Sequence, residues 1–334
     1  MSANTLPRIA VLGTGGTIAG AGISSTQYSG YRAAVSGVDQ LLAAIPALQD
    51  VASLECEQVA QVASQNIGSA TLLHLARRVN YWLNEMDCAG VIVTLGTNAL
   101  EETAYFLNLV VKSRKTVVVT GAMRPSTSLS ADGPMNLYRA VVAAASPLTA
   151  GLGVLVVMND QVIAARDVHK MDTMTVDSFK APVFGILGWV LDKQVRLYKK
   201  PARVHTDDTE FDTSQMDTLP RVDIVMGYQD DSGVAVSALV NAGAQGLVVA
   251  GAGTASLSDA MAEAVSAAVR SGVVVVRAPR SATGIVMKNI EFDDSMHGTV
   301  AGDTLSPVKA KVLLALALAH GKSAEEVQSA FDRY

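Results

Sequence analysis

The feature that most restricts the fold is the recurrence of short apolar segments with helix-like patterns between them. Residues 90–95, 116–120 and 153–158 are almost continuously apolar, and a longer stretch with helical periodicity follows 90–95 and 116–120. Strands buried on both faces have this composition, and their alternation with helices is typical of a parallel sheet covered by helices. The sequence therefore predicts an α/β fold.

The pattern breaks once, in a polar stretch without strand or helix periodicity. We place a linker there, over residues 197–220. It separates a larger N-terminal parallel-sheet domain, residues 1–196, from a smaller C-terminal α/β domain, residues 221–334. We expect the larger domain to be catalytic.

Composition narrows the class of partner. The chain has 334 residues, of which 49% are hydrophobic, and its formal net charge is −5. A protein that binds nucleic acid needs clustered Lys and Arg, so we expect a small-molecule partner and no nucleic acid. No segment resembles a membrane span or an export signal. We expect a cytoplasmic protein without membrane association, or a periplasmic one if a leader was trimmed.

Two apolar segments each end in a glycine-lined turn that holds a threonine. The first reads Gly13-Thr-Gly-Gly-Thr17, and the second reads Leu95-Gly-Thr97-Asn98-Ala99. Open α/β sheets bind ligands beyond the carboxyl ends of their strands, which suggests two candidate nucleophiles. A tight turn without chemistry is the alternative for each. Phosphate binding is disfavoured, since the first turn lacks a Gly-Lys-Ser/Thr ending and has Ile18 where a dinucleotide motif needs glycine.

Longer motifs carry a resemblance over nearly the whole chain. They are Thr-Gly-Gly-Thr-Ile-Ala-Gly at 14–20, the segments 94–107 and 121–137, and Gly-Val-Leu-Val-Val-Met-Asn-Asp at 153–160 with Arg-Asp-Val-His-Lys at 166–170. In these motifs the chain resembles the bacterial type II L-asparaginase and glutaminase-asparaginase family. The resemblance implies a two-domain asparaginase-like fold and an amidohydrolase that needs neither metal nor organic cofactor.

The resemblance also implies roles for individual residues. Thr17 matches the threonine that attacks the substrate carbonyl, Tyr31 matches the lid tyrosine that activates it, and Thr97 and Lys170 match a second threonine with its lysine partner. Expected substrate contacts are Gly16, Ser64, Gln65, Gly96, Asn98, Ala122 and Glu291. Glu291 would act from a neighbouring subunit, which implies a homotetramer built from intimate dimers.

Physical chemistry supports these roles but leaves simpler readings open. A threonine hydroxyl is a poor nucleophile unless a neighbouring group takes its proton, so a nearby Tyr or Lys is the minimum arrangement. Taken singly, Tyr31 could pack a loop, Lys170 could be a solvated charge, and Ser64-Gln65 could form an ordinary turn.

The second turn departs from the family. The family has His-Gly-Thr-Asp-Thr where this chain has Leu95-Gly-Thr97-Asn98-Ala99, and Thr254 replaces an asparagine that some members use near the site. The missing aspartate accepts hydrogen bonds from the substrate's α-ammonium group, whereas Asn98 is neutral. Because a charge-assisted hydrogen bond is about twice as strong as a neutral one, we expect asparagine to be a poor substrate.

The leading hypothesis is a threonine-nucleophile amidohydrolase that acts on a small carboxylate-bearing amide and releases ammonia. One alternative is a hydrolase of cyclic imides or lactams. Another is a non-catalytic small-molecule-binding protein that keeps the fold.

Overall fold

The computed structural model describes residues 6–27 and 29–334, which form two compact units. The first unit ends at Asp217 and the second begins at Thr218, within the segment where we expected a linker. Residues 1–5, part of the stretch examined for an export signal, lie outside the described residues. No helix in the described part of the chain is both long and apolar enough to cross a membrane.

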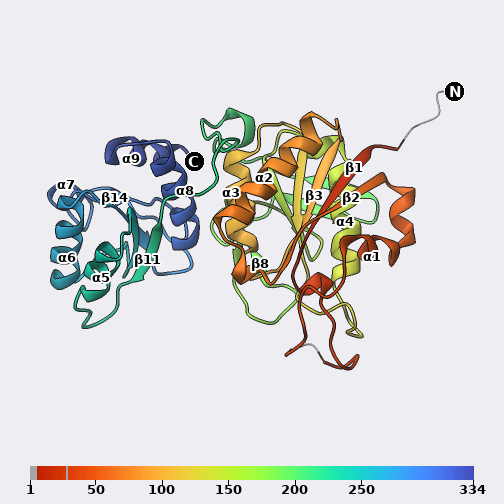
Figure 1. Cartoon of the computed structure of the whole chain (residues 1–334), viewed down its shortest axis with the longest axis horizontal. Coiled ribbons are helices and arrows are strands. Elements are labelled where there is room, and N and C mark those ends of the chain that lie inside the picture. Colours follow the sequence, from red (N-terminus) through yellow and green to blue (C-terminus); the bar gives the residue numbers. More distant parts are fainter. Residues whose placement is uncertain (1–5, 28) are drawn as a thin grey trace. The chain divides into compact units, whose positions relative to one another are not determined.

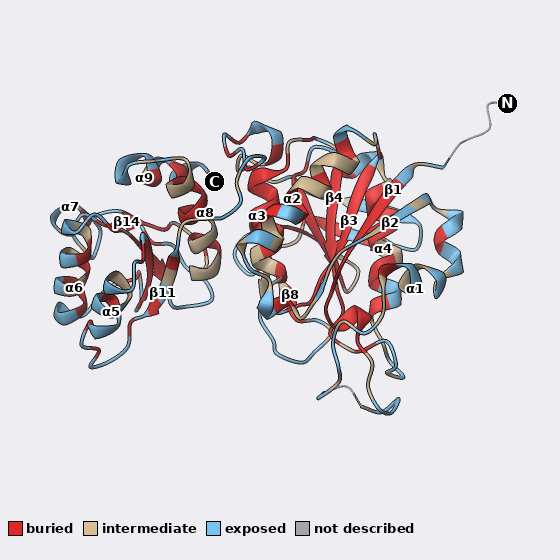
Figure 2. Ribbon diagram, viewed as in Figure 1, coloured by how far each residue is buried: buried red, intermediate tan, exposed pale blue. Residues whose placement is uncertain are grey.

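The first unit is built on an eight-stranded sheet with the order β10-β9-β6-β5-β4-β3-β1-β2. Its strands are β1 (Arg8–Gly15), β2 (Ser53–Val62), β3 (Gly90–Thr94), β4 (Thr116–Thr120), β5 (Val154–Met158), β6 (Gln161–Ala164), β9 (Gly188–Leu191) and β10 (Gln194–Leu197). Every residue of β3, β4 and β5 is buried, as the continuous apolar runs predicted. Figure 2 shows these strands as the buried centre of the unit.

Helices cover both faces of this sheet. The helices are α1 (Val38–Ala43), α2 (Ser69–Asn84), α3 (Leu100–Val110) and α4 (Gly133–Ala145). Helices α1 and α4 pack on one face, where Val38, Leu137 and Val141 join Ile92 and Val118 in one apolar cluster. Helices α2 and α3 lie on the opposite face (Figure 1). Burial of the sheet on both sides leaves its strand ends as the accessible place for a site.

The sheet is mixed. β1 to β5 pair in parallel, as the sequence predicted, whereas β6, β9 and β10 add an antiparallel edge. In β9, buried and exposed residues alternate, which is the pattern of a sheet covered on one face only. A short hairpin of β7 (His169–Lys170) and β8 (Phe179–Lys180) lies between β6 and β9 in the sequence.

The second unit has a parallel four-stranded sheet with the order β11-β12-β13-β14. Its strands are β11 (Val222–Met226), β12 (Gly246–Gly251), β13 (Val274–Pro279) and β14 (Val300–Ala301). Its helices are α5 (Val234–Asn241), α6 (Asp259–Arg270), α7 (Asp294–His297), α8 (Pro307–Ala319) and α9 (Ala324–Arg333). This α/β unit matches the smaller domain that the sequence predicted.

A buried ion pair ties the loops of the second unit together. The Arg277 guanidinium donates two hydrogen bonds of 2.7 Å to the Asp294 carboxylate, and the two side chains are 1% and 0% exposed. Arg277 also donates to the carbonyl of Ala255 at 3.0 Å. Burial alone would raise the pKa of Asp294, but hydrogen bonds from Arg277 and Thr299 outweigh it and hold that pKa below its usual value.

We predict that Arg277→Met lowers the free energy of unfolding by about 3–5 kcal/mol, because it leaves the buried Asp294 carboxylate without its partner. Urea unfolding followed by circular dichroism measures this. Arg221→Met is the control, since the Arg221 and Asp223 side chains of this pair are 47% and 29% exposed and the pair should contribute about 1 kcal/mol or less. Equal losses in the two variants would contradict the assignment.

Candidate active site

Strand pairing brings the two threonine turns together. β1 and β3 are parallel neighbours, with Gly13 opposite Thr94. A buried hydrogen bond of 2.9 Å from the Thr14 hydroxyl to the Thr94 carbonyl joins the ends of the two strands. Because both strands end at the same edge of the sheet, Thr17 and Thr97 emerge side by side into one pocket.

Glycine allows the two turns to touch. A Cβ atom at Gly16 would lie 2.3 Å from the Cα of Gly96, and Gly16 has φ +82°, a conformation that favours glycine. A Cβ at Gly96 would lie 2.7 Å from the Ser64 hydroxyl. Any side chain at Gly16 would therefore push the turns apart. Gly16 and Gly96 thus allow the backbones of the two turns to pack closely against each other.

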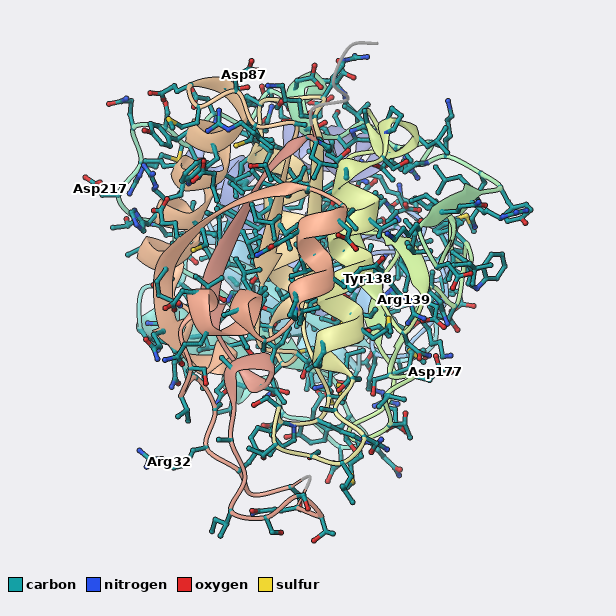
Figure 3. The ribbon with its side chains drawn as sticks, turned by 90° about the vertical axis from the view of Figure 1, so that its right-hand side faces the viewer. Arg32, Asp87, Tyr138, Arg139, Asp177 and Asp217 are labelled. Atoms are coloured by element: carbon teal, nitrogen blue, oxygen red, sulfur yellow. The ribbon has the colours of Figure 1, made fainter. Side chains whose placement is uncertain are left out.

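Thr17 is the first residue of a short 3-10 helix, η1 (Thr17–Ala19), and is 7% exposed. Its hydroxyl lies 2.7 Å from the Tyr31 hydroxyl. Tyr31 belongs to the lid segment, residues 21–36, which extends beyond the strand ends and carries the labelled Arg32 (Figure 3). Tyr28, also in the lid segment, lies outside the described residues. The lid segment thus positions the Tyr31 hydroxyl beside the nearly buried Thr17 hydroxyl.

Lys170, in β7, joins the second threonine to Asn98. Its Nζ donates to the Thr97 hydroxyl at 3.0 Å and to Asn98 Oδ1 at 2.8 Å. Its backbone N–H donates to the Glu101 carboxylate at 2.9 Å, which fixes β7 against the start of α3. Burial lowers the pKa of Lys170 below its usual value, while the nearby Glu101 charge opposes the shift. A lysine in this state loses its proton more readily than a solvated one.

The remaining expected contacts differ in position. Ser64 is 4% exposed and accepts a hydrogen bond from the Asn98 N–H at 3.2 Å. Ala122 is fully buried in the turn after β4. Gln65 is exposed. None of these three residues is in the lining of the pocket that holds Thr17 and Thr97. Ser64 therefore shapes the Asn98 turn.

The pocket has a volume of about 190 Å³, comparable to roughly six water molecules. Its lining contains Thr17, Ser29, Tyr31, Thr97, Asn98, Met123, Lys170, Thr173 and Met174. Met123 follows Ala122 directly, so the motif that identified Ala122 pointed to it. Thr173 and Met174 lie in the loop between β7 and β8, where the sequence pattern gave no signal.

Glu291 belongs to the second unit. Its carboxylate accepts hydrogen bonds from the Thr254 hydroxyl at 2.6 Å and the Ser256 hydroxyl at 3.3 Å. Thr254 thus holds the orientation of Glu291, at the position where some family members have asparagine. Glu291 is exposed in the single chain.

Comparisons with known proteins cover both units. Residues 8–203 match the family model "Asparaginase, N-terminal", and residues 221–331 match "Glutaminase/Asparaginase C-terminal domain". The chain is 46% identical to L-asparaginase 2 of Bacillus subtilis over 98% of this chain and 87% of that protein. It is 45% identical to L-asparaginase 2 of Escherichia coli, and that match covers 100% of this chain and 95% of that protein.

A solved structure is similarly close. The crystal structure of a probable cytoplasmic L-asparaginase from Campylobacter jejuni matches with a TM-score of 0.95 and 41% identity. The match covers 98% of this chain and 100% of that one.

We predict that Gly16→Ala lowers the free energy of unfolding by about 2–4 kcal/mol, because the new methyl group meets the Gly96 backbone and the positive φ disfavours alanine. Thermal or urea unfolding measures this. Gly151→Ala is the matched control: Gly151 also has a positive φ, but its Cβ would meet no atom within 4 Å, so only the backbone cost of about 1 kcal/mol remains. Similar losses in both variants would show that the close approach is unimportant.

Proposed function

Since this chain belongs to the glutaminase/asparaginase family and is a hydrolase of amide C–N bonds, we propose that Thr17 is its nucleophile. The observation that carries the proposal is the 2.7 Å contact between the Thr17 and Tyr31 hydroxyls in a small pocket. A tyrosine at this distance can take the threonine proton as the hydroxyl attacks.

In this mechanism Thr17 Oγ1 adds to the amide carbonyl carbon, and the Tyr31 hydroxyl accepts the Thr17 proton while it passes its own phenolic proton to the amide nitrogen. Glycine-turn N–H groups stabilise the oxyanion that forms. The C–N bond of the nitrogen that Tyr31 has protonated then breaks and releases ammonia, leaving an acyl ester on Thr17. Water then attacks this ester, and we propose that the neutral form of Lys170, whose Nζ lies 3.0 Å from the Thr97 hydroxyl, removes the water proton. The carboxylic acid leaves and the Thr17 hydroxyl is restored.

The substrate that we propose is a small amide with a carboxylate and without an α-ammonium group. A protonated lysine has only donors, so the Asn98 side chain presents its oxygen to Lys170 in that form, and one of that oxygen's two acceptor sites is used. The remaining group, Nδ2, is a donor. An α-ammonium would therefore meet a neutral amide with little acceptor capacity, whereas a carbonyl or carboxylate oxygen could accept from Nδ2. A cyclic imide or lactam remains the alternative, and its ring opening would release no ammonia.

We further propose a homotetramer in which Glu291 completes a neighbouring subunit's site. Two observations support assembly. Glu291 is exposed yet held in place by Thr254, and the antiparallel edge carries exposed Trp189, Leu191 and Tyr198, with the Trp189 and Tyr198 rings in edge contact at 5.6 Å. Exposed apolar patches of this kind mark interaction surfaces.

Sedimentation of the protein should give the mass of four chains, and a monomer at micromolar concentration would contradict the proposal. We also propose a cytoplasmic location, as in the name of the Campylobacter jejuni relative.

Thr17→Ala should reduce ammonia release from the best amide of a linear-amide panel by at least about a thousandfold, because no other group replaces the nucleophile. Thr26→Ala is the control, since Thr26 is an exposed lid threonine that bonds only Ser24 among the hydrogen bonds of the described residues. Near-normal turnover by the Thr17 variant would make Thr97 the candidate nucleophile.

Asn98→Asp should lower the KM for asparagine by about three- to tenfold, because a carboxylate gives the α-ammonium a charged acceptor. The KM for succinamate, which lacks the ammonium group, should not fall. The new negative charge favours protonated Lys170 and raises its pKa, so the ascending limb of the pH profile should move to higher pH. Efficient asparagine hydrolysis by the unmodified protein would overturn this account of Asn98.

A further inference from the structure

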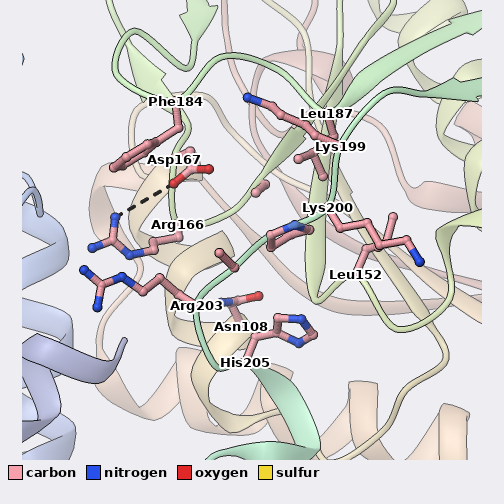
Figure 4. A pocket seen from close by; sticks show the side chains of 13 residues that line it. Asn108, Leu152, Arg166, Asp167, Phe184, Leu187, Lys199, Lys200, Arg203 and His205 are labelled. Carbon is pink, nitrogen blue, oxygen red and sulfur yellow. Dashed lines mark ion pairs between the residues drawn. The ribbon is translucent and has the colours of Figure 1, made fainter.

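A second cavity lies in the first unit and shares no lining residue with the pocket around Thr17. Its volume is about 230 Å³. Its polar lining comes from the end of α3 at Asn108, the turn after β6 at Arg166 and Asp167, and the segment 199–205 that follows β10. Apolar side chains of Leu152, Phe184 and Leu187 complete the lining. Figure 4 shows these side chains around the cavity.

The charge of the cavity is strongly one-sided. Arg166, Lys199, Lys200 and Arg203 line it, and Asp167 is the single carboxylate among the lining residues. In the described part of the chain, no carboxylate pairs with the ammonium group of Lys199 or Lys200. His205 adds no charge at neutral pH, since burial lowers the pKa of its imidazole. An anion would be attracted to this lining.

Apolar side chains line the cavity together with the cationic groups. The Arg166 side chain is only 8% exposed, lies 3.8 Å from the Asp167 carboxylate and approaches the Phe184 ring. Leu152 and Leu187, which are 3% and 1% exposed, form part of the wall. In Figure 4 the Arg166 and Arg203 guanidinium groups point to the same side of the view, and Lys200 points to the other side.

We propose that this cavity binds a small dicarboxylate. Guanidinium groups bind carboxylates through two parallel hydrogen bonds, so Arg166 and Arg203 suit one carboxylate, and a lysine ammonium suits the other. The apolar wall fits a short hydrocarbon chain between the two carboxylates. The volume, close to that of roughly eight water molecules, suits a four- or five-carbon diacid.

The ligand class matches the chemistry of the other site. Hydrolysis of a carboxylate-bearing amide replaces the amide by a second carboxylate, so the product is a dicarboxylate and the substrate is not. The cavity would therefore distinguish product from substrate. This match rests on the proposed function, whereas the charge and shape of the cavity do not.

Calorimetric titration with succinate tests the proposal. The titrated protein is the 334-residue chain with Thr17→Ala and Ser64→Ala introduced, which weaken binding at the active site and prevent turnover. We expect saturable binding with a dissociation constant below about 1 mM, and about tenfold weaker binding with Arg203→Met added, because a charge-assisted contact is lost. Lys200→Met should also weaken succinate binding. Because Lys200 is exposed, this variant replaces Arg203→Met in the test if Arg203→Met unfolds. Succinamide, the neutral diamide, should not bind.

Lys193→Met is the matched control, since Lys193 is an exposed lysine outside the cavity and lies 3.9 Å from Asp50. It should bind succinate normally. Absence of saturable binding up to about 10 mM would overturn the proposal, as would binding that neither Arg203→Met nor Lys200→Met weakens. Heat of binding is measured without turnover, so its outcome is separate from that of the Thr17 experiment.

Discussion

The site depends on one close backbone contact, that between Gly16 and Gly96. The two glycines stand in turns that follow adjacent parallel strands, and a single added Cβ would come within 2.3 Å of the facing backbone. Because both positions lack a side chain, Thr17 and Thr97 reach the same small pocket. The lid then brings the Tyr31 hydroxyl to Thr17, and β7 brings Lys170 to Thr97. The chemical groups come from distant parts of the chain, and the sheet sets their spacing.

The charge balance around Lys170 is the basis of the proposed substrate preference. Burial disfavours the ammonium form, and Glu101, which accepts a hydrogen bond from the Lys170 backbone, supplies a compensating carboxylate. Asn98 supplies hydrogen-bond capacity without charge. In the proposed mechanism this lysine transfers a proton, and Asn98 gives the α-ammonium of a substrate no anionic partner. In this account the neutral Asn98 side chain affects both the protonation of Lys170 and the binding of an α-ammonium group.

The parallel centre of the sheet could be predicted because burial on both faces requires continuous apolar sequence. β2 escaped prediction since it is a sheet edge whose residues, among them Glu55 and Glu57, are partly exposed, and β9 and β10 escaped because short alternating strands give weak signals. The motifs located Thr17, Tyr31, Thr97 and Lys170, which the fold brings together. No sequence pattern revealed Thr173 or Met174 in the lining, because the hairpin after Lys170 has no periodic order.

Peptide mapping of a trapped acyl-enzyme tests the central claim most directly. The protein is mixed with its best amide substrate, quenched in acid within one turnover, digested and analysed by mass spectrometry. We expect the mass of the acyl group on the peptide that contains Thr17, as an ester on that hydroxyl. An ester on the peptide that contains Thr97, or hydrolysis without any covalent adduct under conditions where acylation outpaces deacylation, would contradict the account.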